Sequence, residues 1–131
     1  MNLLEKEFVP YEESVELKEL EFDEPCFGGY DMETLKLWIG YLNDGEQFNR
    51  EYYYPAPTFS QAFRWFRDKY NLSGVIIPTV TMYWTFKTMT VVESIIEVPP
   101  YKHVDANDYR TYEEAELTCL RKLIEIVKQN L

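Results

Sequence analysis

The stretch from Thr111 to Leu131 constrains the fold most, because it carries the signature of one amphipathic helix. Thr111 and Glu114 form a T-x-x-E capping box, whose side chains satisfy backbone N–H groups at a helix start. Lys122 and Lys128 lie late, where the helix dipole favours cations. Apolar residues recur at positions 117, 120, 124 and 127, widened by 123 and 126, which is the spacing of one buried helix face. The stretch therefore predicts a helix that packs on an apolar surface, which the preceding strands can supply.

Length and composition predict a single domain that spans residues 1–131. Hydrophobic residues make up 46% of the chain and aromatic residues 17%, which is enough for a packed core. The start, Met1–Glu7, lacks the basic and apolar regions of a signal peptide. The longest uncharged apolar stretch, Val75–Phe86, is shorter than the ~20 residues of a membrane-spanning helix. We therefore expect a soluble cytoplasmic protein that does not enter a membrane.

Most of the negative charge is concentrated in the N-terminal segment 1–34. This segment holds eleven acidic residues against Lys6 and Lys18, within a chain of net charge −10. The remaining residues are nearly neutral, with twelve acidic and eleven basic side chains. Because nucleic-acid binding needs clustered cations, the distribution argues against a nucleic-acid partner. Solubility from a solvated acidic helix face explains such a segment without any ligand.

Two further helices are predicted from their boundaries. Pro10–Glu13 opens the first helix, whose solvent-facing sides carry Glu12, Glu13, Glu16 and Glu19, and Asp23–Pro25 ends it. A second capping box at Thr58–Gln61 begins the next helix, which Asn71 ends because asparagine tolerates a left-handed φ. One face of this helix is predicted to be core and carries Phe59, Ala62, Phe63, Phe66 and Tyr70.

Alternating patterns predict the strands. Cys26–Tyr30 is a short strand or an extended entry into a turn, and Gly28 and Gly29 need positive φ or close backbone approach. Leu35–Leu42 places Leu35, Leu37, Ile39 and Tyr41 on one face and Lys36, Trp38 and Gly40 on the other. Asn43–Gly45 predicts a hairpin to a returning strand over Gln47–Tyr54. Thr79–Lys87 alternates next, with Pro78 at an edge or bulge; Val91–Val98 is a further strand or part of one long bent strand. A polar loop over Tyr101–Arg110 precedes the last helix.

Together these elements predict an α+β fold. An antiparallel sheet of about four strands would carry the three helices mainly on one face, in the order α-β-β-α-β-β-α.

The sequence offers few groups for catalysis or metal binding. His103 is the only histidine, so two-histidine zinc motifs are absent. Cys26 and Cys119 need not pair, and Cys119 falls between core positions of the last helix, where a thiol is usually inert. Asp105–Asp108 lacks the glycine and glutamate of a calcium loop. We expect no metal and no cofactor, and enzymatic activity is not favoured.

The most suggestive feature outside the core is the run Tyr52, Tyr53 and Tyr54. Consecutive residues of a strand face opposite sides, so at least one of the three rings should lie outside the core. Tyrosine is enriched at interfaces because it combines rigid apolar area with a polar tip. A tyrosine-rich sheet packed under loops is the structural alternative.

Three blocks of the chain resemble small proteins, with no established activity, that phages and mobile elements of gut bacteria encode. They are Phe8–Glu12 with Phe22–Gly28, then Gln61–Arg67, and Tyr112–Leu117 running to Val127. The resemblance implies a bacterial cytoplasmic setting and agrees with the helices expected above. It carries no site residues over to this chain.

Three functions remain as hypotheses. The first is a non-enzymatic protein-binding module, an accessory protein of a phage or mobile element, whose surface includes Tyr52, Tyr53 and Tyr54 and the acidic residues Glu12, Glu16 and Glu19. The second is a DNA-mimicking or charge-based inhibitor of a basic host protein. Binding by the second should weaken steeply with salt, while binding through aromatic anchors should be less sensitive. The third is a small hydrolase or transferase, which needs a pocket with a titratable pair.

Overall fold

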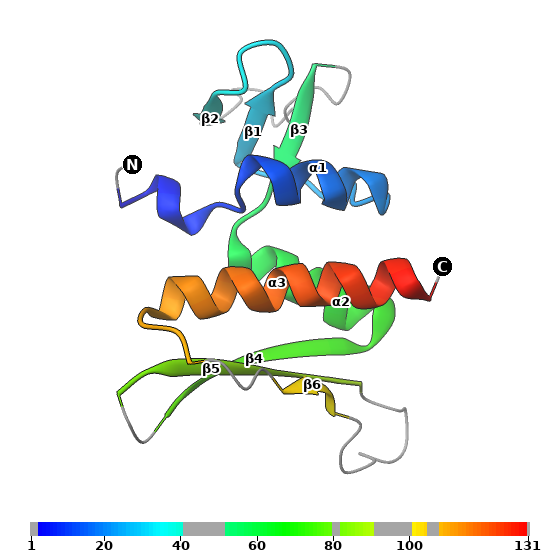
Figure 1. Cartoon of the computed structure of the whole chain (residues 1–131). Coiled ribbons are helices and arrows are strands. Elements are labelled where there is room, and N and C mark those ends of the chain that lie inside the picture. Colours follow the sequence, from blue (N-terminus) through cyan, green and yellow to red (C-terminus); the bar gives the residue numbers. More distant parts are fainter. Residues whose placement is uncertain (1–2, 41–51, 80–81, 91–100, 105–107, 131) are drawn as a thin grey trace. The chain divides into compact units, whose positions relative to one another are not determined.

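The computed structural model describes residues 3–40, 52–79, 82–90, 101–104 and 108–130. The chain forms two compact units, Met1–Ala62 and Phe63–Leu131. Helix α2 (Phe59–Tyr70) contains the boundary between them (Figure 1). The single domain expected from chain length stays a prediction.

The first unit combines two helices with a three-stranded antiparallel sheet. These are the short 3-10 helix η1 (Glu5–Glu7), α1 (Tyr11–Glu19), β1 (Gly28–Asp31), β2 (Leu37–Ile39) and β3 (Tyr53–Ala56). Helix α1 contacts β3 and runs across the sheet (Figure 1). One buried cluster of this unit consists of Phe8, Tyr30 and Ala56, with the half-buried Tyr11, Leu37, Ile39 and Tyr54 packed against them. Further buried apolar residues are Val9, Leu17, Leu20 and Phe22.

Strand β1 lies in the middle of this sheet, in the order β2-β1-β3. Gly28 of β1 pairs with Ile39 on one side and with Ala56 on the other. The predicted direct pairing of the strands around Leu37 and Tyr54 is therefore wrong, and the predicted turn at 43–45 lies outside the described residues. The pairing of β1 with β2 and β3 was not predicted because Gly28 and Gly29 have no side chains, so this strand shows no alternating pattern. A Cβ on Gly28 would lie 2.7 Å from Cδ1 of Phe8 and 2.9 Å from the Ala56 carbonyl oxygen, so glycine is required there.

Leu35, which is predicted to share one strand face with Leu37 and Ile39, lies outside β2. It is 50% exposed and has a φ of 60°, in a turn that precedes β2. The Asp31 carboxylate organises this turn by accepting hydrogen bonds from the backbone N–H groups of Glu33 (2.8 Å) and Thr34 (3.1 Å). This Asx-type turn overrides the strand propensity of the leucine.

Helix α1 ends earlier than expected. Pro25 was predicted to end the helix, but the last helical residue is Glu19, and Glu21 has a left-handed φ of 67°. The Phe22 N–H donates to the Leu17 carbonyl (3.0 Å) and the Glu21 N–H to the Lys18 carbonyl (3.0 Å). This is a Schellman motif, in which the two apolar residues Leu17 and Phe22 are both buried. The Schellman motif therefore ends the helix at Glu19, six residues before Pro25.

Helix α2 follows the predicted pattern. Thr58 Oγ1 accepts a hydrogen bond from the Gln61 N–H (3.2 Å). Asn71 has a φ of 53° directly after the last turn, as predicted. The predicted apolar face is buried, apart from the half-buried Tyr70. Trp65 is also buried, at 5% exposed, so the apolar face is wider than predicted.

The second unit contains an antiparallel sheet in the order β4-β5-β6, formed by β4 (Leu72–Pro78), β5 (Trp84–Thr90) and β6 (Tyr101–Val104). Pro78 is the last residue of β4. In the described part of this sheet β4 pairs only with β5 and is therefore an edge strand, which agrees with the prediction that Pro78 lies at an edge. The strand expected to begin at Thr79 instead begins at Trp84. The chain reverses before it, where the Thr79 N–H donates to the Tyr83 carbonyl (2.8 Å) and Met82 has a φ of 69°. The reversal was missed because Thr79–Tyr83 contains none of the usual turn residues.

Two further differences concern the end of this sheet. Residues 101–104, predicted to be loop, form β6 and pair with Lys87, Thr88 and Met89 of β5. The pairing shifts register between Thr88 and Met89. On its other side, β5 pairs with β4 without interruption up to Thr90, so Lys87–Thr90 belongs to the strand and not to a turn. The predicted strand Val91–Val98 lies outside the described residues.

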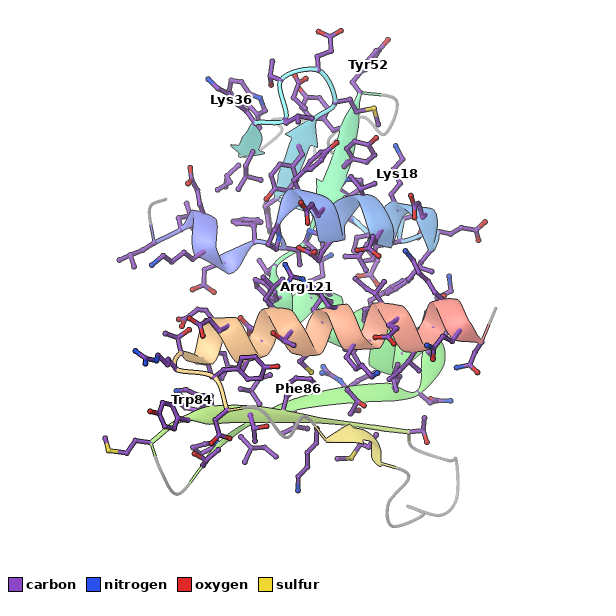
Figure 2. The ribbon with its side chains drawn as sticks, viewed as in Figure 1. Lys18, Lys36, Tyr52, Trp84, Phe86 and Arg121 are labelled. Atoms are coloured by element: carbon purple, nitrogen blue, oxygen red, sulfur yellow. The ribbon has the colours of Figure 1, made fainter. Side chains whose placement is uncertain are left out.

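Helix α3 (Tyr112–Gln129) forms where the sequence predicts it, and its predicted apolar face is buried apart from the half-buried Leu117. Thr111 Oγ1 accepts from the Glu114 N–H at 3.1 Å. The helix packs on β4 and β5, and Phe86 lies on the α3 side of β5 (Figure 2). Its buried residues are Ala115, Cys119, Leu120, Leu123, Ile124, Ile126 and Val127.

The α+β class with three α-helices and antiparallel pairing is confirmed. The strands form two three-stranded sheets in the described residues, instead of one sheet of about four strands. Across the described ranges, no helix combines the length and the apolar character that crossing a bilayer requires.

Candidate functional site

The three predicted tyrosines differ in their exposure. Tyr54 is half-buried, and its ring packs edge-to-face on Tyr11 of α1 with centroids 5.7 Å apart. The Lys18 ammonium lies 5.1 Å from the centroid of the same ring. Tyr53 is half-buried, whereas Tyr52, in the turn that directly precedes β3, is 63% exposed (Figure 2). Tyr52 is therefore the tyrosine of this run that offers most of its ring to a partner.

The predicted acidic residues lie on α1 of the same unit. Glu12 and Glu19 are exposed and Glu16 is half-buried. Positions 12, 16 and 19 share one stripe of a helix, because they are four and three residues apart. The structure therefore places the predicted acids on α1 and Tyr53 and Tyr54 on β3, which contact each other, while Tyr52 directly precedes β3.

The prediction that Glu13 lies on a solvated side of α1 is wrong. Glu13 is only 3% exposed, and it occupies the first turn of the helix. The buried side of this nine-residue helix includes Glu13, Ser14 and Leu17. Burial and the charges of Glu13 and Glu5 raise the pKa of Tyr30 to about 12. A carboxylate in the first turn is also favoured by the helix dipole.

The sheet of the first unit has a second face, opposite its core, on which aromatic residues are exposed. Trp38 is 54% exposed and Phe27 is 62% exposed. In the register of the strands Trp38 faces Gly29, and the Gly40 N–H donates to the Phe27 carbonyl at 2.9 Å. Each aromatic residue therefore has a glycine as its cross-strand neighbour. We call the surface formed by Phe27, Gly29, Trp38 and Gly40 the outer aromatic face.

Trp38 and Phe27 were not among the predicted site residues. The alternation of Leu35–Leu42 does place Trp38 with Lys36 and Gly40, away from the core, and that was the available signal. An aromatic ring on the polar face of an amphipathic strand is a candidate contact residue. Phe27 gives no such signal, because its strand was not recognised with certainty from Gly28 and Gly29.

The net charge of the protein lies entirely in the unit that carries this face. Met1–Ala62 holds fourteen acidic and four basic residues, a formal charge of −10, whereas Phe63–Leu131 holds nine of each. A surface of one sign attracts partners of the opposite sign over about 8–10 Å at physiological salt. The negative charge of the first unit therefore attracts cations.

Both cysteines are free. Burial raises the pKa of the Cys26 thiol to about 12, with a further contribution from Glu24, and the Cys26 thiol donates to the Glu24 carbonyl (3.3 Å). Burial and Glu116 raise the pKa of the Cys119 thiol to about 12 as well. Because the thiolate is the nucleophile, neither group is activated at neutral pH. These shifts lend no support to a hydrolase or transferase.

Metal-binding groups are not assembled in the described part of the chain. There, no three side chains among histidine, cysteine, aspartate and glutamate come close enough to hold a metal ion.

Comparison with known protein families, with curated proteins and with solved structures finds no match.

Proposed function

We propose that the protein is a non-enzymatic binding module for a basic protein, and that its first unit makes the contact. The observation that carries the proposal is that the exposed aromatic side chains Trp38, Phe27 and Tyr52 belong to the unit that holds the whole net charge. Tryptophan and tyrosine dominate the energetics of protein interfaces, and exposed apolar clusters mark interaction sites. Opposite charge speeds association and selects the partner.

The resemblance to proteins of phages and mobile elements supports a more specific role. We propose that the module is an accessory protein of such an element and acts in the bacterial cytoplasm on a protein of the host or of the element itself.

Affinity capture tests this function. The full chain is immobilised and exposed to bacterial lysate at low and at high salt, and the retained proteins are identified. An interface anchored by aromatic residues predicts a basic protein that is retained at both salt concentrations and lost with the double variant Trp38→Ala/Tyr52→Ala. Tyr83→Ala, which removes an exposed ring of the second unit, is the matched control and should retain the partner.

A charge-based inhibitor, including a DNA mimic, is the second candidate, because the charge is segregated to one unit. It predicts that the partner is retained only at low salt. It also predicts that the triple variant Glu12→Gln/Glu16→Gln/Glu19→Gln loses more binding than the aromatic variant. Retention of no basic protein at either salt concentration would contradict both candidates.

A further inference from the structure

We propose that the outer aromatic face binds the cationic side chains of lysine or arginine in an extended segment of the partner. This inference rests on the proposed function and adds the chemistry that the site recognises. The proposed occupant of the outer aromatic face is a basic peptide segment of the partner protein. The register of the strands, the space beside Gly40 and the charge of the first unit support this occupant.

The strand register places the two aromatic residues diagonally on one face. Gly29 and Trp38 are directly opposite each other. Phe27 and Gly40 lie one residue beyond the ends of β1 and β2, and the hydrogen bond from the Gly40 N–H to the Phe27 carbonyl extends the same register to them. Diagonal neighbours of this kind have Cα atoms about 7–8 Å apart. A guanidinium or ammonium group is attracted to an aromatic ring within about 6 Å of its centroid. The spacing therefore allows one cation to contact both rings, or two successive cations to contact one ring each.

Among the described residues, the space beside Gly40 is open. A Cβ built on Gly40 meets no atom of the described residues within 4 Å, whereas one built on Gly28, on the core face of the same sheet, meets Phe8 and Ala56 at under 3.0 Å. Side-chain positions alternate between faces along a strand, so Gly40 lies on the face of Trp38 and Phe27. An incoming side chain can approach there without displacing an atom of the described ranges.

The charge around the face favours a cation. Asp31 follows Gly29 by two residues on the same face of β1, roughly 7 Å along the strand, and Glu33 in the adjoining turn is exposed. The unit as a whole carries a formal charge of −10. Lys36 also lies beside β2 and is exposed (Figure 2), so it should repel a cationic ligand.

The chain itself shows the geometry that the ligand would adopt. The Lys18 ammonium lies 5.1 Å from the centroid of the Tyr54 ring, and the Lys69 ammonium lies 5.1 Å from the centroid of the Trp65 ring. A lysine or arginine of the partner would make the same contact with Trp38 from outside.

Titration of a defined peptide into the full chain tests the inference. The probe is a blocked hexapeptide that alternates glycine and arginine, compared with the same peptide in which citrulline replaces arginine. Binding is followed by tryptophan fluorescence and by backbone amide shifts. We expect the arginine peptide to bind at least fivefold more tightly than the citrulline peptide, and Trp38→Ala to weaken its binding about two- to fivefold.

Three further variants make the result specific. Gly40→Val fills the open space without a clash and should weaken binding, while Lys36→Gln should strengthen it. Tyr83→Ala, in the second unit, should leave the affinity unchanged. Equal affinity for the two peptides would overturn the inference, as would unchanged affinity in both Trp38→Ala and Gly40→Val. Circular dichroism and urea unfolding of each variant show that it is folded.

The outcome is separable from that of the proposed function. If the captured basic protein binds wild type and Trp38→Ala equally, the partner is real but the outer aromatic face is not its site. If the arginine peptide binds as expected while no basic protein is captured, the site recognises cations but the function as a protein-binding module fails.

Discussion

The Tyr30 hydroxyl donates a hydrogen bond of 3.0 Å to the Val9 carbonyl oxygen, which also accepts from the Ser14 hydroxyl at 3.2 Å. The Val9 N–H donates in turn to the Pro57 carbonyl at 2.9 Å. Residues from β1, from α1 and from the segment after β3 thus converge on a single buried residue. This point holds α1 against the sheet that presents the outer aromatic face on its other side.

Removal of the Tyr30 hydroxyl should destabilise the protein modestly. Because Ser14 still donates to Val9 in Tyr30→Phe, the loss is that of one hydrogen bond, about 1 kcal/mol of unfolding free energy. Urea unfolding measures it. Tyr52→Phe is the control, since Tyr52 is exposed, and it should change the stability by under about 0.5 kcal/mol.

The raised pKa of Tyr30, about 12 against an ordinary value of 10, predicts a pH dependence. The phenol keeps its proton to higher pH in the folded chain than in the unfolded chain. Its contribution to stability is therefore complete below pH 10 and is lost as the pH rises towards 12. The difference in unfolding free energy between wild type and Tyr30→Phe should shrink over this window. A difference that stays constant from pH 9 to 12 would contradict the assignment.

Glu21→Gly should stabilise the protein. Glu21 occupies the left-handed position of the Schellman motif, which costs a non-glycine residue roughly 1–2 kcal/mol, and glycine recovers part of this despite its greater chain entropy. We expect a gain of about 0.5–1 kcal/mol in thermal or urea unfolding. The same substitution two residues earlier, Glu19→Gly, falls in the helix and should cost about 1 kcal/mol. Equal effects at the two positions would show that the motif is not formed.

Gly74→Ala should destabilise the second unit. The new Cβ would lie 2.6 Å from the Cys119 sulfur and 3.3 Å from Cδ1 of Leu123, so α3 and β4 must move apart. Overpacking of this kind costs about 1–3 kcal/mol. Gly40→Ala adds the same atom to open space and should cost far less. Since Cys119→Ala removes the clashing sulfur, the double variant with Gly74→Ala should be more stable than the sum of the single effects predicts.

The helices were predictable from the sequence because their signals are local. Thr111 and Thr58 each accept a hydrogen bond from the N–H three residues later, as a capping box requires. The buried faces of α2 and α3 follow the spacing of their apolar residues. The end of α1 was not predictable in this way, because a glutamate at the left-handed position of a C-cap is unusual.

The sheets were less predictable because strand pairing is a relation between distant residues. The alternation around Leu37 correctly separated the core residues from Trp38, but it cannot reveal that β1 lies between β2 and β3. Glycine at position 28 resembles a turn signal, although its role is to let Phe8 and Ala56 approach. Likewise, the reversal between β4 and β5 was not predictable, because methionine is an unusual residue at the left-handed position that Met82 occupies.

The candidate site was foreseen only in part. Composition reveals the charge of residues 1–34. Alternation predicts only that at least one of Tyr52, Tyr53 and Tyr54 lies outside the core, and it does not indicate that Tyr52 is the most exposed. The pairing of Trp38 with Gly29, and of Phe27 with Gly40, depends on strand register, which no local pattern specifies.

Hydrogen exchange of the full chain, alone and bound to its captured basic partner, tests the central claim most directly. We predict slower amide exchange on binding in the first unit, at Phe27–Gly29 and Leu37–Gly40, with α3 and β4 unchanged. Protection confined to Phe63–Leu131, with none around Trp38, would contradict the account.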